Sequence, residues 1–405
     1  MGTKSASGVG FRAGPDTLAA RFGWTSCRIS DRLWFVRQVI LVVWSGGMNA
    51  DTFFRAARKL VSRPEIALNR VFGREFIPAE PDLLFIETTS VCNLECCFCP
   101  YVKKTGARVS MTQEVFMDCV NQALAIGYRR FDLTPCTGDV FMDPGLFEKL
   151  QFLDANPKVK GYEFYTNFTI PREKDIEQLV GLKKLDKLYI SIYGHDLPTF
   201  QAITNANEKL YRRLLFNLRA LLARSDRRQF GLELAYRSTH DMPRRAAGEL
   251  MQTTEAFERS GVKVRMNRAY YNNWGGTISA ADIKGLPLTV VKTGSTPKNG
   301  ACSLLFTSVQ VRANQIVNGC ACRDVEATLR IGDLKEKPLR EIISAWNPAY
   351  MALIDGQQKG DFRPVCRSCD YYTSIYHQRS NYVRDRVKTE SLSDFKMRLG
   401  ARTAH

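Results

Sequence analysis

The sequence lacks both a secretory signal and an apolar run long enough to cross a membrane. The N-terminus has no early apolar core, and the most apolar stretch, residues 39–44, is far shorter than the ~20 residues that a spanning helix needs. Signatures of RNA-binding modules, such as an RRM motif or a zinc knuckle, are also missing. The sequence therefore predicts neither a secreted protein nor a membrane-spanning one, and nucleic acid is not an expected partner.

The composition fits a globular protein with more than one structural unit. A chain of 405 residues with 44% hydrophobic residues is long enough for a barrel of ~200–250 residues plus a smaller domain. The formal charge of +17 suits an anionic substrate or an anionic surface such as a membrane, although a basic solvated surface without a partner explains it equally well. Most of the twelve cysteines fall into metal-ligand groups, which favours a reducing cytoplasm and predicts oxygen sensitivity.

Three cysteines lie close together at Cys92, Cys96 and Cys99, and no fourth ligand of the same group is available. Three thiolates can hold three irons of a [4Fe-4S] cluster and leave the fourth iron open to a small molecule, whereas four cysteines would close the site. Zinc is the alternative, but zinc sites usually pair one Cys-x2-Cys with a second pair. Cys97, between two of the proposed ligands, is expected to be a packing thiol.

The Cys-x3-Cys-x2-Cys spacing, with Phe98 directly before the last cysteine, resembles the signature of the radical SAM superfamily. The resemblance implies that the open iron binds S-adenosylmethionine through its amino and carboxylate groups. Electron transfer then cleaves the sulfonium to a 5′-deoxyadenosyl radical. A reducing partner such as flavodoxin or ferredoxin is implied as well.

Between residues 83 and 270 the pattern alternates between strands and helices. Candidate strands cover 83–88, 131–134, 162–165, 187–192, 230–235 and 262–266, and stretches such as 113–125 and 209–223 suit helices. This alternation predicts an α/β fold with parallel strands and right-handed crossovers. Six such units suit a partial (β/α)6 barrel of the TIM type, in which chemistry collects at the carboxyl ends of the strands.

The resemblance assigns S-adenosylmethionine contacts to residues near the cysteine motif and after the strands, namely Phe98, Gly138, Asp139, Thr166, Asn167, Ser191 and Arg237. The Arg237 guanidinium could form a fork onto the carboxylate of the cofactor. The chain departs from the family pattern at three positions. Asp139 replaces a glutamate, Phe168 replaces a glycine, and Tyr193 replaces an aspartate.

The C-terminal part resembles the SPASM or shorter twitch extension, which carries an auxiliary iron–sulfur cluster. Alternating apolar residues in 306–320 predict a β-hairpin. The resemblance implies one auxiliary [4Fe-4S] cluster, with Cys302, Cys320, Cys366 and Cys369 as ligands. Cys322 would be spare or could replace Cys320, and zinc in the same sulfurs is the alternative.

These observations divide the chain into five parts. The expected parts are a flexible tail (1–30), a helical N-terminal extension (31–80), the radical SAM barrel (81–275), the auxiliary domain (276–375) and a C-terminal tail (376–405). Residues 31–63 combine apolar and basic helix faces, which suit either peripheral membrane contact or packing against the rest of the protein.

The resemblance predicts a radical SAM enzyme that oxidises or epimerises a small polar, sugar-like or lipid-linked substrate. Arg265, Arg268, Tyr270 and Tyr271 are expected to meet an anionic substrate. Two alternatives remain, a maturase that modifies a ribosomally made peptide and a non-catalytic iron–sulfur electron-transfer protein.

Overall fold

The computed structural model describes residues 64–81, 83–243, 247–283 and 285–401, and it contains one large sheet. Nine strands form this sheet in the order β12-β11-β10-β2-β3-β4-β5-β6-β7. The six strands from β2 to β7 pair in parallel, as predicted, β10 adds a further parallel pair with β2, and β11 and β12 are antiparallel additions. The α/β class is confirmed. The helices expected in 31–63 lie outside the described residues.

All six predicted strands are present: β2 (Leu83–Ile86), β3 (Arg130–Asp132), β4 (Gly161–Thr166), β5 (Leu185–Tyr193), β6 (Gly231–Ser238) and β7 (Lys263–Arg268). The helices between them are α4 (Gln113–Ala125), α5 (Leu146–Ala155), α6 (Glu173–Val180), α7 (Leu197–Thr204), α8 (Glu208–Leu222) and α9 (Gly248–Arg259). The prediction of 113–125 matches α4 at both ends, and the prediction of 209–223 is one residue late for α8.

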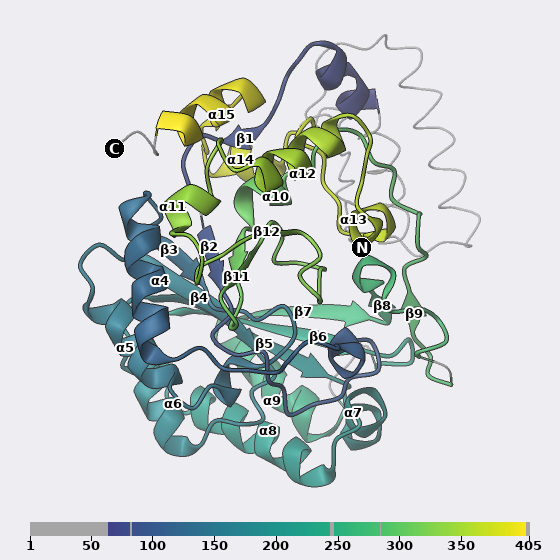
Figure 1. Cartoon of the computed structure of the whole chain (residues 1–405). Coiled ribbons are helices and arrows are strands. Elements are labelled where there is room, and N and C mark those ends of the chain that lie inside the picture. Colours follow the sequence, from purple (N-terminus) through teal and green to yellow (C-terminus); the bar gives the residue numbers. More distant parts are fainter. Residues whose placement is uncertain (1–63, 82, 244–246, 284, 402–405) are drawn as a thin grey trace, which may run out of the picture. The chain divides into compact units, whose positions relative to one another are not determined.

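The helices of the barrel cover one face of the sheet (Figure 1), and several of them begin at side-chain caps. The Thr112 hydroxyl accepts a hydrogen bond from the Val115 N–H at the start of α4, and the Asn207 side chain accepts one from the Leu210 N–H at the start of α8. Alternate strand residues bury their side chains against these helices, among them Leu84, Phe131, Phe164, Ile190 and Leu234. This apolar layer is the main core of the barrel.

The opposite face of the same strands is polar. Tyr165 on β4 and Tyr189 on β5 stack with their ring centroids 4.1 Å apart. Asp132 and Glu163 are opposite each other on β3 and β4, and Glu233 is opposite Tyr189 on β6. Because side chains alternate along a strand, this row faces away from the apolar helix layer. The face of the barrel turned away from the helices therefore presents hydroxyl and carboxylate groups.

The predicted hairpin is present and extends the barrel sheet. It consists of β10 (Gln310–Val311) and β11 (Ile316–Asn318), and β12 (Arg330–Asp333) pairs with β11. β10 is also parallel to β2, with the Phe85 N–H donating to Val309 O and the Glu87 N–H donating to Val311 O. The region expected to form a separate domain at 276–375 therefore shares its sheet with the barrel.

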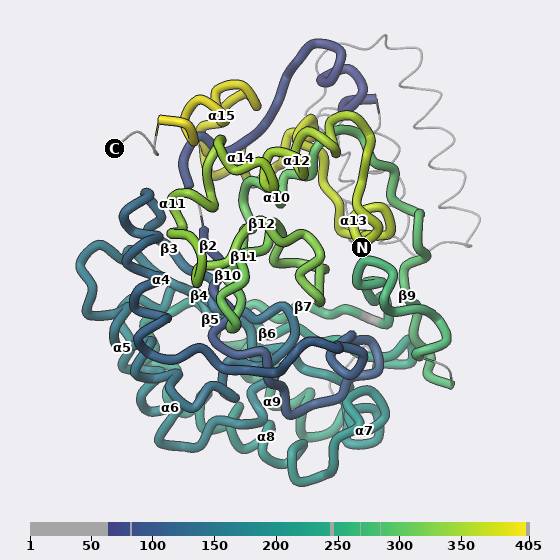
Figure 2. Tube along the Cα trace, viewed as in Figure 1, coloured from purple at the N-terminus to yellow at the C-terminus, as the bar shows by residue number. Residues whose placement is uncertain are grey.

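Six further helices of the C-terminal part of the chain lie around this hairpin. They are α10 (Leu304–Thr307), α11 (Leu339–Ile342), α12 (Pro348–Gln358), α13 (Pro364–Ser368), α14 (Ser380–Arg384) and α15 (Leu392–Ala401). β1 (Ile77–Pro78) pairs with β13 (Thr389–Glu390), so the purple and yellow parts of the chain meet in Figure 2. None of the described helices has both the length and the apolar character needed to span a bilayer.

A buried ion pair near α5 should contribute strongly to stability. Lys149 Nζ lies 2.7 Å from Asp143 Oδ2, and both side chains are almost fully buried. We expect Lys149→Met to lower the free energy of unfolding by about 3–5 kcal/mol, because Asp143 is left as an unpaired buried charge. Urea unfolding measures this change. Lys158→Met, which alters an exposed lysine, is the control, and an equally small effect of both variants would contradict the prediction.

The Asp132 carboxyl should make stability depend on pH. Burial, together with the nearby Glu163 carboxylate, raises the pKa of Asp132 to about 7. The native state then binds more protons than the unfolded chain between about pH 4 and pH 7, so stability should fall as pH rises through this range. Asp132→Asn should flatten the curve measured by urea unfolding from pH 5 to pH 8. Asp226→Asn, at an exposed position, should leave the curve unchanged.

Candidate active site

The loop that carries Cys92, Cys96 and Cys99 follows β2 and is fixed by backbone hydrogen bonds from two directions. The Glu95 N–H donates to Thr204 O and the Cys97 N–H donates to Ile203 O, at the end of α7. On the other side, the Asp139 N–H donates to Val91 O over 2.9 Å. The loop is therefore held between α7 and the segment after β3, at the carboxyl ends of the strands.

A second apolar cluster surrounds this loop. It consists of Leu94, Cys96, Phe98, Ile203, Ala269, Tyr271, Ile283 and Leu288. The Phe98 ring stacks on Tyr271 with centroids 4.4 Å apart and meets Tyr193 at 5.3 Å. These rings come from three separate segments of the chain, and together they keep water away from the thiols.

The three thiols share a buried environment that suits soft metal ligands. Burial, the Asp139 carboxylate and the neighbouring Cys99 together raise the pKa of Cys92 to about 12. Burial also raises the pKa of Cys99 to about 12, against the opposing charge of Arg237. The pKa of Cys96 is raised by burial and by both neighbouring thiols. Thiols placed this way need a bound cation to ionise, and closely grouped sulfur ligands suit iron–sulfur clusters.

No group of three or more His, Cys, Asp or Glu side chains within the described ranges is arranged around a single metal ion. The eleven cysteines in those ranges are all free thiols. Cys97, expected to be a packing thiol, is half-buried and packs against the apolar cluster around the loop.

Asp139 and the end of β4 form one hydrogen-bonded unit. The Asp139 carboxylate accepts hydrogen bonds from the Thr166 hydroxyl at 3.0 Å, the Asn167 N–H at 2.6 Å and the Phe141 N–H at 3.0 Å. Burial raises the pKa of Asp139 to about 6. The structure thus brings three of the predicted cofactor residues together, and their contact with S-adenosylmethionine stays a prediction.

Asn93 extends this unit to the cysteine loop. Its Oδ1 accepts a hydrogen bond from Asn167 Nδ2, and its own Nδ2 donates to the Thr169 hydroxyl, both over 2.9 Å. Sequence reasoning did not single out Asn93, although it directly follows Cys92. This amide joins the first proposed cluster ligand to the end of β4.

Two backbone positions near the loop have positive φ angles. Gly138 has φ +143°, and a Cβ there would lie 3.0 Å from Val91 O, so only glycine allows the two loops to approach this closely. Phe168, which replaces the family's glycine, has φ +57°. This conformation costs about 1–2 kcal/mol for a side-chain-bearing residue. Its fully buried ring and the hydrogen bond from Asn217 Nδ2 to Phe168 O offset that cost.

The carboxyl ends of β5 and β6 supply the remaining predicted residues. Tyr193 is directly opposite Arg237 in the parallel register, and Ser191 is opposite Ala235. Arg237 is partly buried, and its charge opposes the burial effect on the pKa of both Cys96 and Cys99. The position of Arg237 at the strand end is thus close to the cysteine loop, and its contact with the cofactor stays a prediction.

The cysteines of the C-terminal region form a second group of thiols. Burial raises the pKa of each, and each is close enough to others of the group to affect them: Cys302, Cys320, Cys322, Cys366 and Cys369. Gln357 joins two of their segments, because its Oε1 accepts from the Cys302 N–H at 2.8 Å and its Nε2 donates to Cys366 Sγ at 3.3 Å. No sequence motif points to Gln357.

Two further thiols of this group accept hydrogen bonds from backbone N–H groups. Cys320 Sγ accepts from the Cys322 N–H at 3.4 Å, and Cys369 Sγ accepts from the Tyr371 N–H at 3.3 Å. Hydrogen bonds to the ligand sulfurs are one of the features that set the potentials of iron–sulfur clusters. The Cys322 thiol is close to Cys302 and Cys369 as well as to Cys136, and the choice of Cys320 over Cys322 as a ligand stays a prediction.

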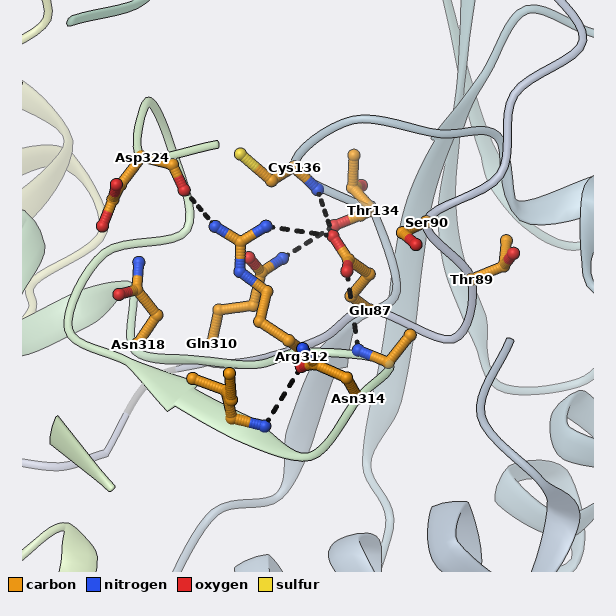
Figure 3. A network of polar contacts seen from close by, with 12 residues as sticks. Glu87, Thr89, Ser90, Thr134, Cys136, Gln310, Arg312, Asn314, Asn318 and Asp324 are labelled. Carbon is orange, nitrogen blue, oxygen red and sulfur yellow. Dashed lines mark hydrogen bonds and ion pairs between the residues drawn. The ribbon is translucent and has the colours of Figure 1, made fainter. Parts of the chain in front are cut away.

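A buried polar network connects the barrel to the hairpin close to both cysteine groups (Figure 3). Arg312 directly follows β10, and its Nη1 lies 3.2 Å from Glu87 Oε2, which also accepts a hydrogen bond from the Cys136 N–H at 3.1 Å. Arg312 also donates to the backbone carbonyl of Asp324. Glu87 directly follows β2, the strand before the Cys92 loop. The network therefore joins this strand to the hairpin that precedes Cys320.

Arg265, expected to meet an anionic substrate, has an ion-pair partner within the sheet. Arg265 forms an ion pair with Glu233, which also lies 2.9 Å from Lys187 Nζ. Tyr271 has a different place, since its ring stacks on Phe98. Glu233 also pairs with Lys263, so one carboxylate faces three cations, and the substrate contact expected of Arg265 stays a prediction.

No family model matches the chain, and no curated protein matches it.

Several solved structures have a similar chain trace. BtrN in complex with AdoMet and 2-DOIA is 15% identical, covers 74% of this chain and 97% of its own, and has a TM-score of 0.46. SuiB of Streptococcus suis bound to S-adenosylmethionine is 13% identical and covers 90% and 88%, with a TM-score of 0.48. Native anSMEcpe with bound AdoMet is 16% identical and covers 78% and 97%, with a TM-score of 0.46. All three of these structures contain S-adenosylmethionine.

Proposed function

We propose that this protein is a radical SAM enzyme. The observation that carries the proposal is the group of three thiols, Cys92, Cys96 and Cys99, on one loop at the carboxyl ends of parallel strands, inside an apolar cluster. These thiols would hold a [4Fe-4S] cluster, which supplies the electron that cleaves S-adenosylmethionine. A one-electron donor of the flavodoxin or ferredoxin type would have to reduce it.

The chain's own residues would bind and enclose the cofactor. Arg237, opposite Tyr193 at the strand ends, offers a guanidinium for its carboxylate. Asp139, Thr166 and Asn167 form the hydrogen-bonded wall beside the cysteine loop. Phe98 and Tyr271 close the apolar side, which keeps water and oxygen from a reactive radical.

A small polar substrate suits the barrel face turned away from the helices. This face carries the stacked Tyr165 and Tyr189 together with Asp132, Glu163 and Glu233. Tyrosine hydroxyls and carboxylates can pair with the hydroxyl and amino groups of a sugar-like or cyclitol-like molecule. A single auxiliary cluster with four protein ligands would accept an electron from the substrate, and so we favour net oxidation. Epimerisation and peptide modification are the competing outcomes that product analysis distinguishes.

The proposal predicts that cleavage of S-adenosylmethionine requires the Cys96 thiol but not the adjacent Cys97 thiol. Anaerobically reconstituted protein with dithionite should form 5′-deoxyadenosine, and Cys96→Ala should reduce this to background because it removes an iron ligand. Cys97→Ala is the matched control, since the neighbouring thiol packs without ligating, and it should retain most of the activity. Chromatographic quantification of deoxyadenosine measures both.

Absence of deoxyadenosine from wild-type protein whose cluster is demonstrably reduced, with sugar-like and peptide candidates present, would overturn the enzyme proposal. Equal loss in Cys96→Ala and Cys97→Ala would instead reject the ligand assignment.

The auxiliary ligand set makes a prediction about iron content. Two cubane clusters imply about eight irons per chain, and replacing Cys92, Cys96 and Cys99 together should leave about four. In that background Cys320→Ala should remove most of the remaining iron, whereas Cys322→Ala should keep it. Iron and zinc analysis after anaerobic purification decides the matter. Zinc in this site, or a greater loss from Cys322→Ala, would contradict the assignment.

A further inference from the structure

One loop connects the two cysteine groups. Tyr271 stacks on Phe98, the residue before Cys99, with ring centroids 4.4 Å apart. Three residues later, Trp274 lies under the guanidinium of Arg323, whose Cζ is 4.8 Å from the ring centroid. Arg323 directly follows Cys322 in the chain. The loop thus reaches from the first cysteine group to the second within four residues.

The same guanidinium is held on its other side by an aromatic residue of the auxiliary group. Arg323 Cζ lies 4.7 Å from the ring centroid of Tyr371, whose N–H donates to Cys369 Sγ. Arg323 is therefore sandwiched between Trp274 and Tyr371. Stacking of this kind fixes the plane of a guanidinium and suits arginine much better than lysine.

Close packing holds the loop in this position. Asn273 Nδ2 donates to Ser368 O at 2.8 Å, between Cys366 and Cys369 in the chain. Gly275 has φ +64°, and a Cβ there would lie 2.5 Å from the side chain of Val365. A side chain at Gly275 would push the loop off α13, so the position of Trp274 depends on that glycine.

Among the described residues, no carboxylate forms an ion pair with the Arg323 guanidinium. Its Nη1 donates to Cys322 O at 2.6 Å, and with the Asn272 amide oxygen turned toward it, its Nη2 donates there at 2.5 Å. Both acceptors are neutral oxygens. Arg323 Nε is shielded from solvent and makes no hydrogen bond to any described residue. A positive charge in such a setting acts on nearby groups with little screening by water.

We propose that Arg323 is a positioning residue shared by both cluster sites, and that its charge raises the reduction potentials of both clusters. The inference rests on the proposed function, because it requires clusters at both cysteine groups. Reduction adds a negative charge to a cluster, so a cation nearby stabilises the reduced form and raises the potential. The geometry supports it: the loop from Tyr271 to Trp274 links Phe98 of the first group to Arg323, and Tyr371 on the other side of Arg323 donates to Cys369 Sγ.

A shared charge lowers the demand on the external reductant. The same cation would make the first cluster easier to reduce before the cofactor is cleaved and the auxiliary cluster a better acceptor afterwards. It also couples the two sites, since an electron on one cluster offsets part of the positive charge felt by the other.

EPR-monitored redox titration of the anaerobically loaded full chain tests this inference. The first cluster is identified by the change that S-adenosylmethionine makes to its signal. Arg323→Gln should shift both midpoint potentials to more negative values, and Arg323→Lys should restore part of both shifts because it keeps the charge. Arg367→Gln is the control, as Arg367 lies between Cys366 and Cys369 in the chain but is exposed, and it should leave the first cluster unchanged.

A shift of the auxiliary potential alone, or of neither, would overturn the shared role. Should Arg323→Gln fail to retain about eight irons, Trp274→Leu replaces it, because it frees the guanidinium without removing its charge. Unaltered potentials in Trp274→Leu would then count against the inference. The proposed function fails separately, if wild-type protein binds no iron or cleaves no S-adenosylmethionine.

Discussion

The buried ion pair between Glu87 and Arg312 is the interaction on which both cysteine sites depend. Glu87 is five residues before Cys92, and Arg312 donates to the carbonyl of Asp324, two residues after Cys322. Burying two charges is costly, and it is tolerated only when further hydrogen bonds satisfy them. Here the Cys136 N–H and a backbone carbonyl supply those bonds. A single interaction thus fixes the loops of both thiol groups relative to one sheet.

The strands and helices of the barrel could be predicted because each has a local signal. Apolar periods of the strand and the helix are visible in the sequence, and the cap at Thr112 places the start of α4. The pairing of β10 with β2 could not be predicted, since a two-residue strand carries no period and its partner lies more than 200 residues away. The pairing of β1 with β13 was missed for the same reason.

The candidate site divides in a similar way. Cysteine spacing indicated the first thiol group, because ligands of one cluster are often close in sequence, and the resemblance to the SPASM or twitch extension indicated the second. Asn93, Gln357 and Arg323 were missed, because each acts on a partner brought near only by folding. Arg265, expected to meet an anionic substrate, forms an ion pair with Glu233 on the neighbouring strand, a partner that the sequence does not reveal, and its contact with a substrate stays a prediction. Sequence indicates which chemistry is available, while the pairing of charges needs the fold.

The continuous sheet has a consequence for how such a protein could be rearranged in evolution. Cutting the chain between barrel and auxiliary region would remove β10 and leave the Phe85 and Glu87 N–H groups of the β2 segment without their acceptors. An unpaired strand edge of this kind invites association with other chains. The C-terminal region therefore forms one sheet with the barrel and is not a separable module. A gene fusion that exchanges this region would have to supply a strand that pairs with β2.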